Sequence, residues 1–380
     1  MTKVAIIGVG YSGYAPLTPH MSFKEMMFEA AKRAYTDAGI NPRTDVGSFI
    51  CCEEDLWEGI SITDEYVPDQ LGGAQRAVCT VSDDGLVGLI NGYMQIKSGL
   101  TDVVVVESHS KLSNVVSQGD VTRMSFEPYY ERPFLTAETA VALEMRRYMF
   151  ERELDDDIPA MVVAKNKKNG LGNPRAPYSA ILSMDEVLSS PMVCEPLRKA
   201  HIPEPADGCS VTVLASEEKA RILVDQPVWI RGVGWFSDTP WVSQRDFSKA
   251  VYAEGSSKMA YKMAGVNTPA KHFDFIEVDD SYGYKELQHL EALGVYTKEN
   301  IKRAVEVGET DLRGPLPVNP SGGKISLGDM VEANGLVRVV EAVLTLRGQG
   351  PRSLRGAKHA LVQSWRGPPT ASGSTVILEV

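Results

Sequence analysis

Two widely separated segments of this chain repeat one pattern, and the repeat constrains the fold more than any other feature of the sequence. A Gly-Leu-Val motif at 85–87 begins a helical stretch, which is followed by a turn and an apolar, strand-like run at 103–106. The same motif at 335–337 begins a second helical stretch, followed by a strand-like run at 360–362. Two helices of equal length can agree by chance, but the shared start and the shared following strand favour a duplication. Two similar halves would face each other across a cleft at their helix N-termini, where anions are stabilised.

Strand-like and helix-like runs alternate along the chain, which indicates an α/β fold with a mainly parallel sheet covered by helices. The first helix is expected from Ser22 to Gly39, because apolar residues recur there at helical spacing and Ser22 with Glu25 forms a capping box. From about 111 to 205 the alternation is lost. We expect this segment, called the excursion below, to be an insertion that packs on the surface of the core. The division that follows is an N-terminal half, 1–220, which includes the excursion, and a C-terminal half, 221–380. The other predicted strands are 3–8, 46–52, 210–214, 228–233 and 273–278, and the other predicted helices are about 137–151 and 247–264.

Charge and composition exclude several classes of protein. The 380 residues carry a formal net charge of −11, which gives no broad electrostatic reason to bind nucleic acid or an anionic membrane. Hydrophobic residues make up 43% and charged residues 23%, which excludes a disordered chain. The five cysteines show no CxxC spacing and the six histidines are scattered, so neither a metal site nor a disulfide framework is indicated. With no apolar run that could span a membrane and no cleavable signal, we expect a soluble, cytoplasmic protein.

Several separated motifs, in order, resemble those of the thiolase superfamily. The helix end and strand at 96–106 look like the stretch after the thiolase nucleophile helix, and Gly328 to Gly335 sits where the family has its Gly-His-Pro motif. The resemblance covers nearly the whole chain and is closest to the sterol-carrier-type and archaeal-type thiolases. The further motifs that carry it are Asn173-Pro174, Met192 to Leu197, Ala206 to Cys209, Asn319 to Gly323 and Glu341 to Gly348.

The resemblance implies a thiolase fold, with two similar βαβ-type halves in a five-layered α-β-α-β-α arrangement and an inserted loop region. It implies an acyl-CoA thioester as substrate, with coenzyme A entering as part of that substrate and no other cofactor bound. It also implies a homodimer paired through the strand after the nucleophile helix, for which the apolar run Val103 to Val106 is the candidate. Relatives of this kind often work with a small partner chain that has a zinc ribbon and an OB-fold.

The family's catalytic residues do not carry over to this sequence. The nucleophilic cysteine falls on Ser82, and the first histidine, of the His-Asp-Cys-Phe motif, falls on Asp279. The Gly-His-Pro histidine falls on Asp329, and the late His-Asn pair falls on Gln363-Ser364. A thiolase needs a thiolate at a helix N-terminus and a histidine that deprotonates it, so these four changes alter the chemistry.

The nucleophile position has two interpretations. Ser82 is followed by Asp83 and Asp84, which oppose formation of an alkoxide, and a Ser-Asp-Asp-Gly run is a good helix start. We therefore expect Ser82 to be a helix cap, with a nucleophile as the alternative. Cys79 lies three residues earlier, and a small buried thiol is its ordinary interpretation, with an alternative nucleophile as the other.

The two aspartates at the histidine positions are the main catalytic candidates. If the fold brings Asp279 and Asp329 together, they would flank the thioester and share a proton, which splits their pKa values and supplies an acid and a base. The alternative is a pair of solvated loop acids. Tyr282 would protonate or bind a carbonyl oxygen, or simply pack. The residues expected to bind substrate or CoA are Gly322, Gly323, Gln363, Ser364 and Arg366, the last through a CoA phosphate unless it is a surface residue.

Three functions remain open at this stage. The first is an acyl-CoA carbon–carbon lyase that releases a short acyl-CoA without a cysteine nucleophile, with Asp279 and Asp329 as base and acid. The second is a thiolase-like acyltransferase that uses Ser82 or Cys79. The third is a non-catalytic thiolase-fold subunit of a larger complex. The sequence favours the first by a small margin over the third.

Overall fold

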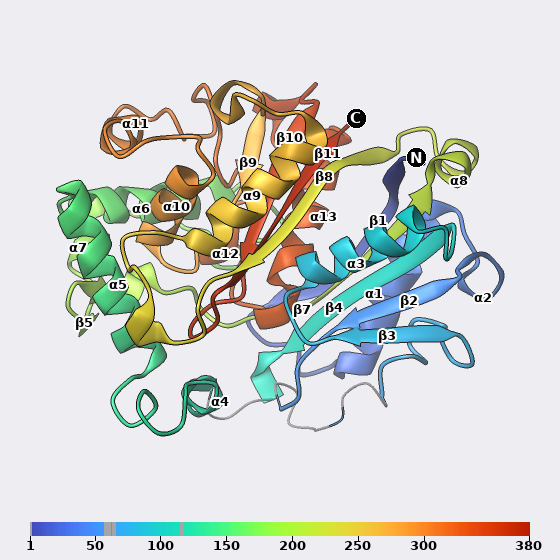
Figure 1. Cartoon of the computed structure of the whole chain (residues 1–380), viewed down its shortest axis with the longest axis horizontal. Helices are drawn as coiled ribbons and strands as arrows, with labels where there is room; N and C mark the ends of the chain where they lie inside the picture. Colours follow the sequence, from blue (N-terminus) through green and yellow to red (C-terminus); the bar gives the residue numbers. More distant parts are fainter. Residues whose placement is uncertain (1, 57–61, 63–65, 115–117) are drawn as a thin grey trace.

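A computed structural model describes residues 2–56, 62, 66–114 and 118–380 of the chain (Figure 1). In this part of the chain, nine strands form one mixed sheet in the order β3-β2-β4-β7-β1-β8-β11-β10-β9. Only two residue pairs, Ala5 with Trp229 and Ile6 with Val228, join β1 to β8 in the middle of the sheet. The strands are β1 (Val4–Ala15), β2 (Ser48–Cys52), β3 (Ala77–Val81), β4 (Val103–Lys111), β7 (Asp207–Ser216), β8 (Val228–Ser237), β9 (Phe275–Glu277), β10 (His359–Trp365) and β11 (Ser372–Glu379).

Apart from β3, the strands on one side of this junction have counterparts on the other side. On one side, β1 and β4 each pair antiparallel with β7, and β2 pairs parallel with β4. On the other side, β8 and β10 each pair antiparallel with β11, and β9 pairs parallel with β10. The helices correspond as well: α1 (Phe23–Ala38) with α9 (Val251–Ala264), and α3 (Gly85–Lys97) with α13 (Asn334–Leu346). The repeated α/β organisation is therefore confirmed, whereas the division at residue 220 stays a prediction.

The expectation of a mainly parallel sheet is wrong. Besides the two parallel pairs above, only β2 with β3 is parallel, and the remaining neighbours are antiparallel. The reason is that the last strand of each half, β7 or β11, runs against the others and is inserted between two of them. An alternation of helices and strands does not reveal the direction of that last strand.

Three hydrophobic clusters show how the layers stack. One cluster lies between α1 and the outer face of the first half of the sheet, and a second lies between α9, α10 (Gly283–Ala292) and the outer face of the other half. The third surrounds α3 and α13, which lie between the two halves (Figure 1). Residues of β4 alternate between the layers, with Val103 and Val105 toward α1 and Val104 and Val106 toward α3 and α13. This alternation explains why the run is apolar throughout, and the five layers are those expected.

The strand expected at a dimer contact is not at an edge. β4 lies between β2 and β7, and all nine of its residues are buried. The strand at this edge of the sheet is β3, whose residues are exposed or partly buried. An apolar run on both faces marks the centre of a sheet, and a strand with neighbours on both sides has no free edge for pairing with a second copy.

The segment between β4 and β7 adds no strand to the main sheet within the described residues. It contains a small hairpin, and its helix α6 packs on α10, α11 (Ile301–Glu306) and α12 (Gly323–Leu327). Among the described helices, none combines the length and the apolar character that crossing a lipid bilayer requires. The elements of this segment are α4 (Gln118–Met124), α5 (Ala137–Arg152), α6 (Asp157–Gly170), α7 (Met184–Leu188), β5 (Met192–Cys194) and β6 (Leu197–Arg198).

Candidate active site

The first turns of α3 and α13 meet at the centre of the molecule, and Asp84 joins them. Its Oδ1 accepts the Leu86 N–H of α3 at 2.9 Å, and its Oδ2 accepts the Gly335 N–H of α13 at 3.0 Å. The glycines permit this approach, because a Cβ on Gly335 would lie 1.8 Å from Asp84 Oδ1 and one on Gly85 would lie 2.7 Å from Leu336 Cγ. Burial raises the pKa of Asp84 to about 6, against the backbone N–H that lowers it.

Ser82 and Cys79 lie outside this junction. The N-cap of α3 is Asp84, so the expectation that Ser82 caps the helix is wrong; an aspartate two residues later accepts both N–H groups. Ser82 is exposed in the bend before the helix. Cys79 is exposed on the edge strand β3, so the expected buried thiol is wrong as well, because an edge strand is covered on fewer sides. Neither residue lines the cavity described below.

Asp279 follows β9 and is fully buried in an ion pair. Its Oδ2 lies 2.6 Å from Arg338 Nη2 of α13, and its Oδ1 accepts hydrogen bonds from the Ser281 N–H at 2.9 Å and Oγ at 2.5 Å. Burial alone would raise the pKa of Asp279, but Arg338 and then Lys324 outweigh it and hold the pKa well below the usual range. Asp279 is therefore an anion that fixes Arg338 and Ser281.

Gln363 and Ser364 on β10 support this ion pair from behind. Gln363 Oε1 accepts the Asp279 N–H at 3.0 Å, and Ser364 Oγ accepts a hydrogen bond from Arg338 Nη1 at 3.0 Å. Both are fully buried and neither lines the cavity. Their assignment to substrate binding stays a prediction that these contacts do not favour.

A small cavity of about 100 Å³ lies beside the loop that follows Asp279. Lys324 of α12 reaches it, and its Nζ lies 3.0 Å from Asp329 Oδ1 and 3.1 Å from Ser281 Oγ. The lining residues come from the excursion, the loop before α10, the glycine-rich turn and the segment after β10: Thr122, Ala137, Ile202, Pro203, Ser281, Tyr282, Lys324, Asp329, Val331, Arg366, Gly367 and Pro368.

Asp329 presents one free carboxylate oxygen at this cavity. Its Oδ1 accepts the Val331 N–H at 3.0 Å and Asn334 Nδ2 at 2.9 Å in addition to Lys324, whereas its Oδ2 accepts no hydrogen bond from any described residue. About a third of the Asp329 side chain is exposed. Burial would raise its pKa, but Lys324, Asn334 and the Val331 N–H together lower it, so the carboxylate is ionised at neutral pH.

The two aspartates do not share a proton. Each is bound to its own cation, Asp279 to Arg338 and Asp329 to Lys324, and the pKa of each is lowered. A carboxylate pair that shares a proton has one raised pKa, so this part of the expectation is wrong. The two groups are linked indirectly, through Ser281 and Lys324. The sequence pattern at 279 and 329 could not show this, since the separating cations come from α12 and α13.

Of the remaining predicted residues, Tyr282 and Arg366 line the cavity. Burial, and then Asp329, raise the pKa of Tyr282 far above its ordinary value, so it is a neutral phenol. Arg366 is bound to Glu54 at 2.6 Å and to Glu332 at 3.1 Å, with a side chain only 9% exposed. It is not a surface residue. The two carboxylates neutralise its guanidinium through Nε and Nη2, so its contact with a CoA phosphate stays a prediction that these ion pairs do not favour.

Gly322 and Gly323 shape the turn that carries Lys324 and do not line the cavity. Both have positive φ angles, of 103° and 61°. A Cβ on Gly323 would lie 2.2 Å from Oδ2 of Asp280, whose carboxylate accepts the Lys324 N–H at 2.6 Å and the Ile325 N–H at 3.3 Å. The glycines thus let the turn close onto Asp280.

Three functional residues were missed from the sequence: Ser281, Lys324 and Arg338. Ser281 stands where the family motif has its cysteine, and Lys324 directly follows the two glycines of the glycine-rich turn, which was the available signal. Arg338 stands among apolar residues of the buried helix α13, and a charged residue in such a stretch was the available signal for it.

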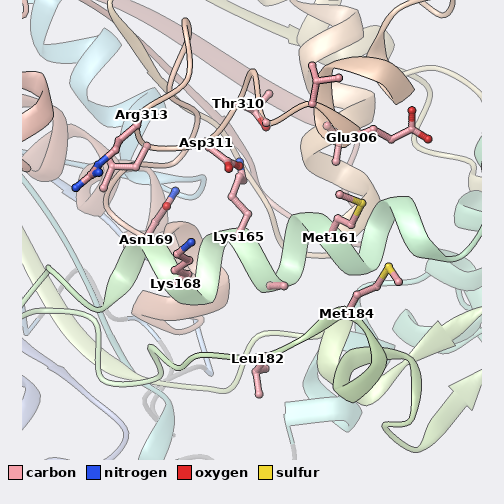
Figure 2. A pocket seen from close by; sticks show the side chains of 15 residues that line it. Met161, Lys165, Lys168, Asn169, Leu182, Met184, Glu306, Thr310, Asp311 and Arg313 are labelled. Carbon is pink, nitrogen blue, oxygen red and sulfur yellow. The ribbon is translucent and has the colours of Figure 1, made fainter.

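A larger hollow, of about 860 Å³, lies against α6, and none of the predicted residues line it. Figure 2 shows Lys168, Asn169 and Arg313 toward one end of it and Met161 and Met184 toward the other. It is connected to α10 through Lys165, whose Nζ contacts Glu286 at 2.5 Å. Among the described residues, no group of three or more His, Cys, Asp or Glu side chains is arranged to hold a metal ion.

Comparisons with known proteins agree with this architecture. A family model described as thiolase C-terminal domain-like matches residues 234–380. An acetyl-CoA acetyltransferase of Methanothermobacter thermautotrophicus is 28% identical over 375 residues, covering 96% of each chain. Sterol carrier protein 2 of Homo sapiens is 32% identical over 383 residues, covering 95% of this chain and 69% of that protein. The solved structure named Ltp2-ChsH2(DUF35) aldolase has the same fold, with a TM-score of 0.86 at 22% identity over 100% of this chain and 98% of that chain.

Proposed function

The chain belongs to the thiolase superfamily and is of the sterol-carrier type, and on this basis we propose that it cleaves a carbon–carbon bond of a β-hydroxyacyl-CoA. The reaction is a retro-aldol cleavage that releases a short acyl-CoA and a carbonyl compound. It proceeds without a covalent acyl-enzyme, in contrast to a reaction that starts from a cysteine thiolate. Coenzyme A takes part only as a portion of the substrate.

The observation that carries this proposal is the composition of the small cavity. None of the described residues that line it is a cysteine or a histidine. Instead it presents an ionised carboxylate with one free oxygen, Asp329, beside the ammonium of Lys324 and the neutral phenol of Tyr282. This set offers a base and hydrogen-bond donors but no activated nucleophile.

A retro-aldol cleavage requires those groups. Asp329 Oδ2 accepts the proton of the β-hydroxyl group while the bond between Cα and Cβ breaks, and the electron pair moves into the thioester as an enolate. The carbonyl product leaves, and the enolate takes a proton at Cα from the Asp329 carboxyl group. Asp279 holds Ser281 and Arg338 in place and does not itself meet the substrate.

Two kinds of relative support different parts of this assignment. The structural neighbour with a TM-score of 0.86 is named an aldolase, which supports carbon–carbon bond cleavage on this fold. The relatives named acetyl-CoA acetyltransferases support an acyl-CoA substrate, and they also favour acyl transfer as the second candidate function. In that case the acyl group would be carried by Ser82 or Cys79.

Intact-protein mass spectrometry, together with an assay for cleavage of β-hydroxyacyl-CoA thioesters, tests the proposal. We expect turnover without an adduct. We expect Asp329→Asn to lower the rate of cleavage at least ~100-fold, because the base is removed. Asp185→Asn, which changes an exposed aspartate on α7, is the matched control and keeps full activity. A stable acyl adduct on Ser82 or Cys79 would refute the lyase. If neither adduct nor turnover is seen, with or without a partner chain, the non-catalytic subunit remains.

We also propose that the chain forms a homodimer through the edge strand β3 and works with a second chain. The unpaired backbone groups of β3 are a template for pairing with a second copy. The solved aldolase is named as an assembly of Ltp2 with the DUF35 protein ChsH2, which supports a small partner of the zinc-ribbon and OB-fold kind. A cytoplasmic location remains part of this proposal.

Alkylation of cysteine thiols tests the homodimer. Cys79 on β3 is exposed in the single chain, so a dimer formed through this edge protects it at high protein concentration. Cys194, on β5 in the excursion, is the internal control and reacts at the same rate at all concentrations. Rapid alkylation of Cys79 in a species whose mass is that of a dimer would show that another surface is used.

A further inference from the structure

We infer, on the basis of the function proposed above, that the Lys324 ammonium binds the thioester carbonyl oxygen and stabilises the enolate as the carbon–carbon bond breaks. The family motifs identified in the sequence do not assign a role to this position. Three features support this role: the position of the Lys324 side chain, its one unoccupied hydrogen-bond donor, and the ion pairs that already neutralise the neighbouring Arg366.

The backbone around Lys324 is held firmly. Its N–H donates to Asp280 Oδ1 at 2.6 Å, and the next N–H, of Ile325, donates to Asp280 Oδ2 at 3.3 Å. Asp280 is itself held by Asn166 Nδ2 of α6 at 2.9 Å. The Lys324 side chain is only 5% exposed, yet its end lines the cavity. A side chain fixed in this way meets the requirement that catalytic dipoles be organised before the reaction begins.

One donor of the Lys324 ammonium is left for a ligand. An ammonium group has three N–H donors and no acceptor. In the part of the chain that the structure describes, one donor is directed to Asp329 at 3.0 Å and one to Ser281 at 3.1 Å. The third has no protein acceptor there. Because the same group contacts the base Asp329, a carbonyl oxygen bound to it lies close to the carboxylate that takes the β-hydroxyl proton.

The neighbouring cation is already neutralised. Among the described residues that line the cavity, Arg366 is the other cation, and Glu54 and Glu332 both bind it. Arg338 is bound to Asp279 and Ser364 and does not line the cavity. A negative charge that develops on a substrate oxygen in this cavity is therefore met by Lys324.

The step balances without a further reactant. The β-hydroxyl proton moves to Asp329, the bond between Cα and Cβ breaks, and the electron pair becomes the enolate whose oxygen is held by Lys324. The enolate then takes the proton from Asp329 at Cα, which restores the carboxylate. Lys324 stays protonated throughout and forms no covalent bond.

Exchange of the Cα protons of a short acyl-CoA in D₂O isolates this role, because it requires formation of the enolate but no carbon–carbon cleavage. Acetyl-CoA and propionyl-CoA are the probes, with exchange followed by mass spectrometry. We expect Lys324→Met to reduce both the exchange rate and the kcat of cleavage by about 10²–10³, the usual effect of removing one oxyanion donor. Lys324→Arg, which keeps the charge, restores part of the exchange. Lys168→Met, at an exposed lysine of α6, is the matched control and leaves both rates unchanged.

A pH profile separates this role from a merely supporting one. Lys324 lowers the pKa of Asp329, so its removal raises that pKa and moves the acid limb of the profile to higher pH. If Lys324 served only to keep Asp329 ionised, the activity of Lys324→Met would recover at high pH. We expect the loss to persist at every pH, and full recovery at high pH would overturn the inference while leaving the lyase standing. Absence of exchange and of cleavage in the unaltered protein, even with a partner chain, would refute the proposed function itself.

Discussion

Replacing Glu277 by glutamine should remove a strong pH dependence from the stability of the protein. Glu277 ends β9, is completely buried, and its carboxyl group bonds to the Ser321 N–H at 3.1 Å and to Ser321 Oγ at 2.8 Å. Burial, with a contribution from Glu341, raises its pKa from 4.5 to about 8 against the Ser321 hydrogen bonds and Arg338. Glutamine has the shape of the neutral acid and can keep both contacts.

The direction in which the stability changes with pH follows from proton binding by Glu277. Between pH 4.5 and about 8 the folded protein holds a proton on Glu277 that the unfolded chain has lost. The stability that this group contributes is therefore fully present below pH 4.5 and is lost as the pH rises toward 8. At ~1.4 kcal/mol for each pH unit, the loss over this range is about 5 kcal/mol, which is a large part of the stability of an ordinary domain.

Urea unfolding at a series of pH values measures this difference. We expect Glu277→Gln to be within about 1 kcal/mol of the unaltered protein at pH 5 and several kcal/mol more stable at pH 8.5. Glu218→Gln, at an exposed glutamate of α8 (Glu217–Leu223), controls for the loss of one negative charge. Two stability curves that run parallel from pH 5 to pH 8.5 would refute the reasoning, because the buried carboxyl would then be ionised in the folded protein.

Two further predictions concern the contacts of α13. Gly335→Ala places a Cβ against Asp84 and should cost about 1–3 kcal/mol in denaturant unfolding, whereas Gly172→Ala, with open space around it, should cost less than about 1 kcal/mol; equal costs would show that the junction can relax. Arg338→Met leaves the buried carboxylate of Asp279 unpaired and should cost about 3–5 kcal/mol. Adding Asp279→Asn should recover most of that loss, and a double variant as unstable as the single one would contradict the ion-pair account.

Much of the fold could be predicted from the sequence because short local patterns mark its helices and strands. The two Gly-Leu-Val starts mark helices that occupy equivalent places, α3 and α13, and the apolar run of β4 marks a central strand. Strand direction was not predictable in this way, since β7 and β11 are placed by contacts with strands distant in the chain. The position of the edge strand was missed for the same reason.

For the site, the sequence located the segments but not the chemistry between them. Asp329 and Tyr282 do line the cavity, whereas Asp279 lies behind it. What decides the state of each aspartate is a cation from another segment, Arg338 or Lys324, and a single sequence does not show which cation meets which carboxylate. A charged side chain in a buried, apolar stretch is the one local sign of such a pairing, and Arg338 on α13 is an example.

The carboxylate of Asp84 couples the stability of the two repeats. Because Asp84 is the N-cap of α3, fraying of the first turn of α3 displaces the carboxylate and also releases the Gly335 N–H of α13. In native-state hydrogen exchange, every opening that exposes the Leu86 amide should therefore also expose the Gly335 amide, although the two belong to different repeats. The two halves are therefore not expected to unfold independently. The second copy begins its helix on a carboxylate that the first copy supplies, so it is not expected to persist as a separate domain.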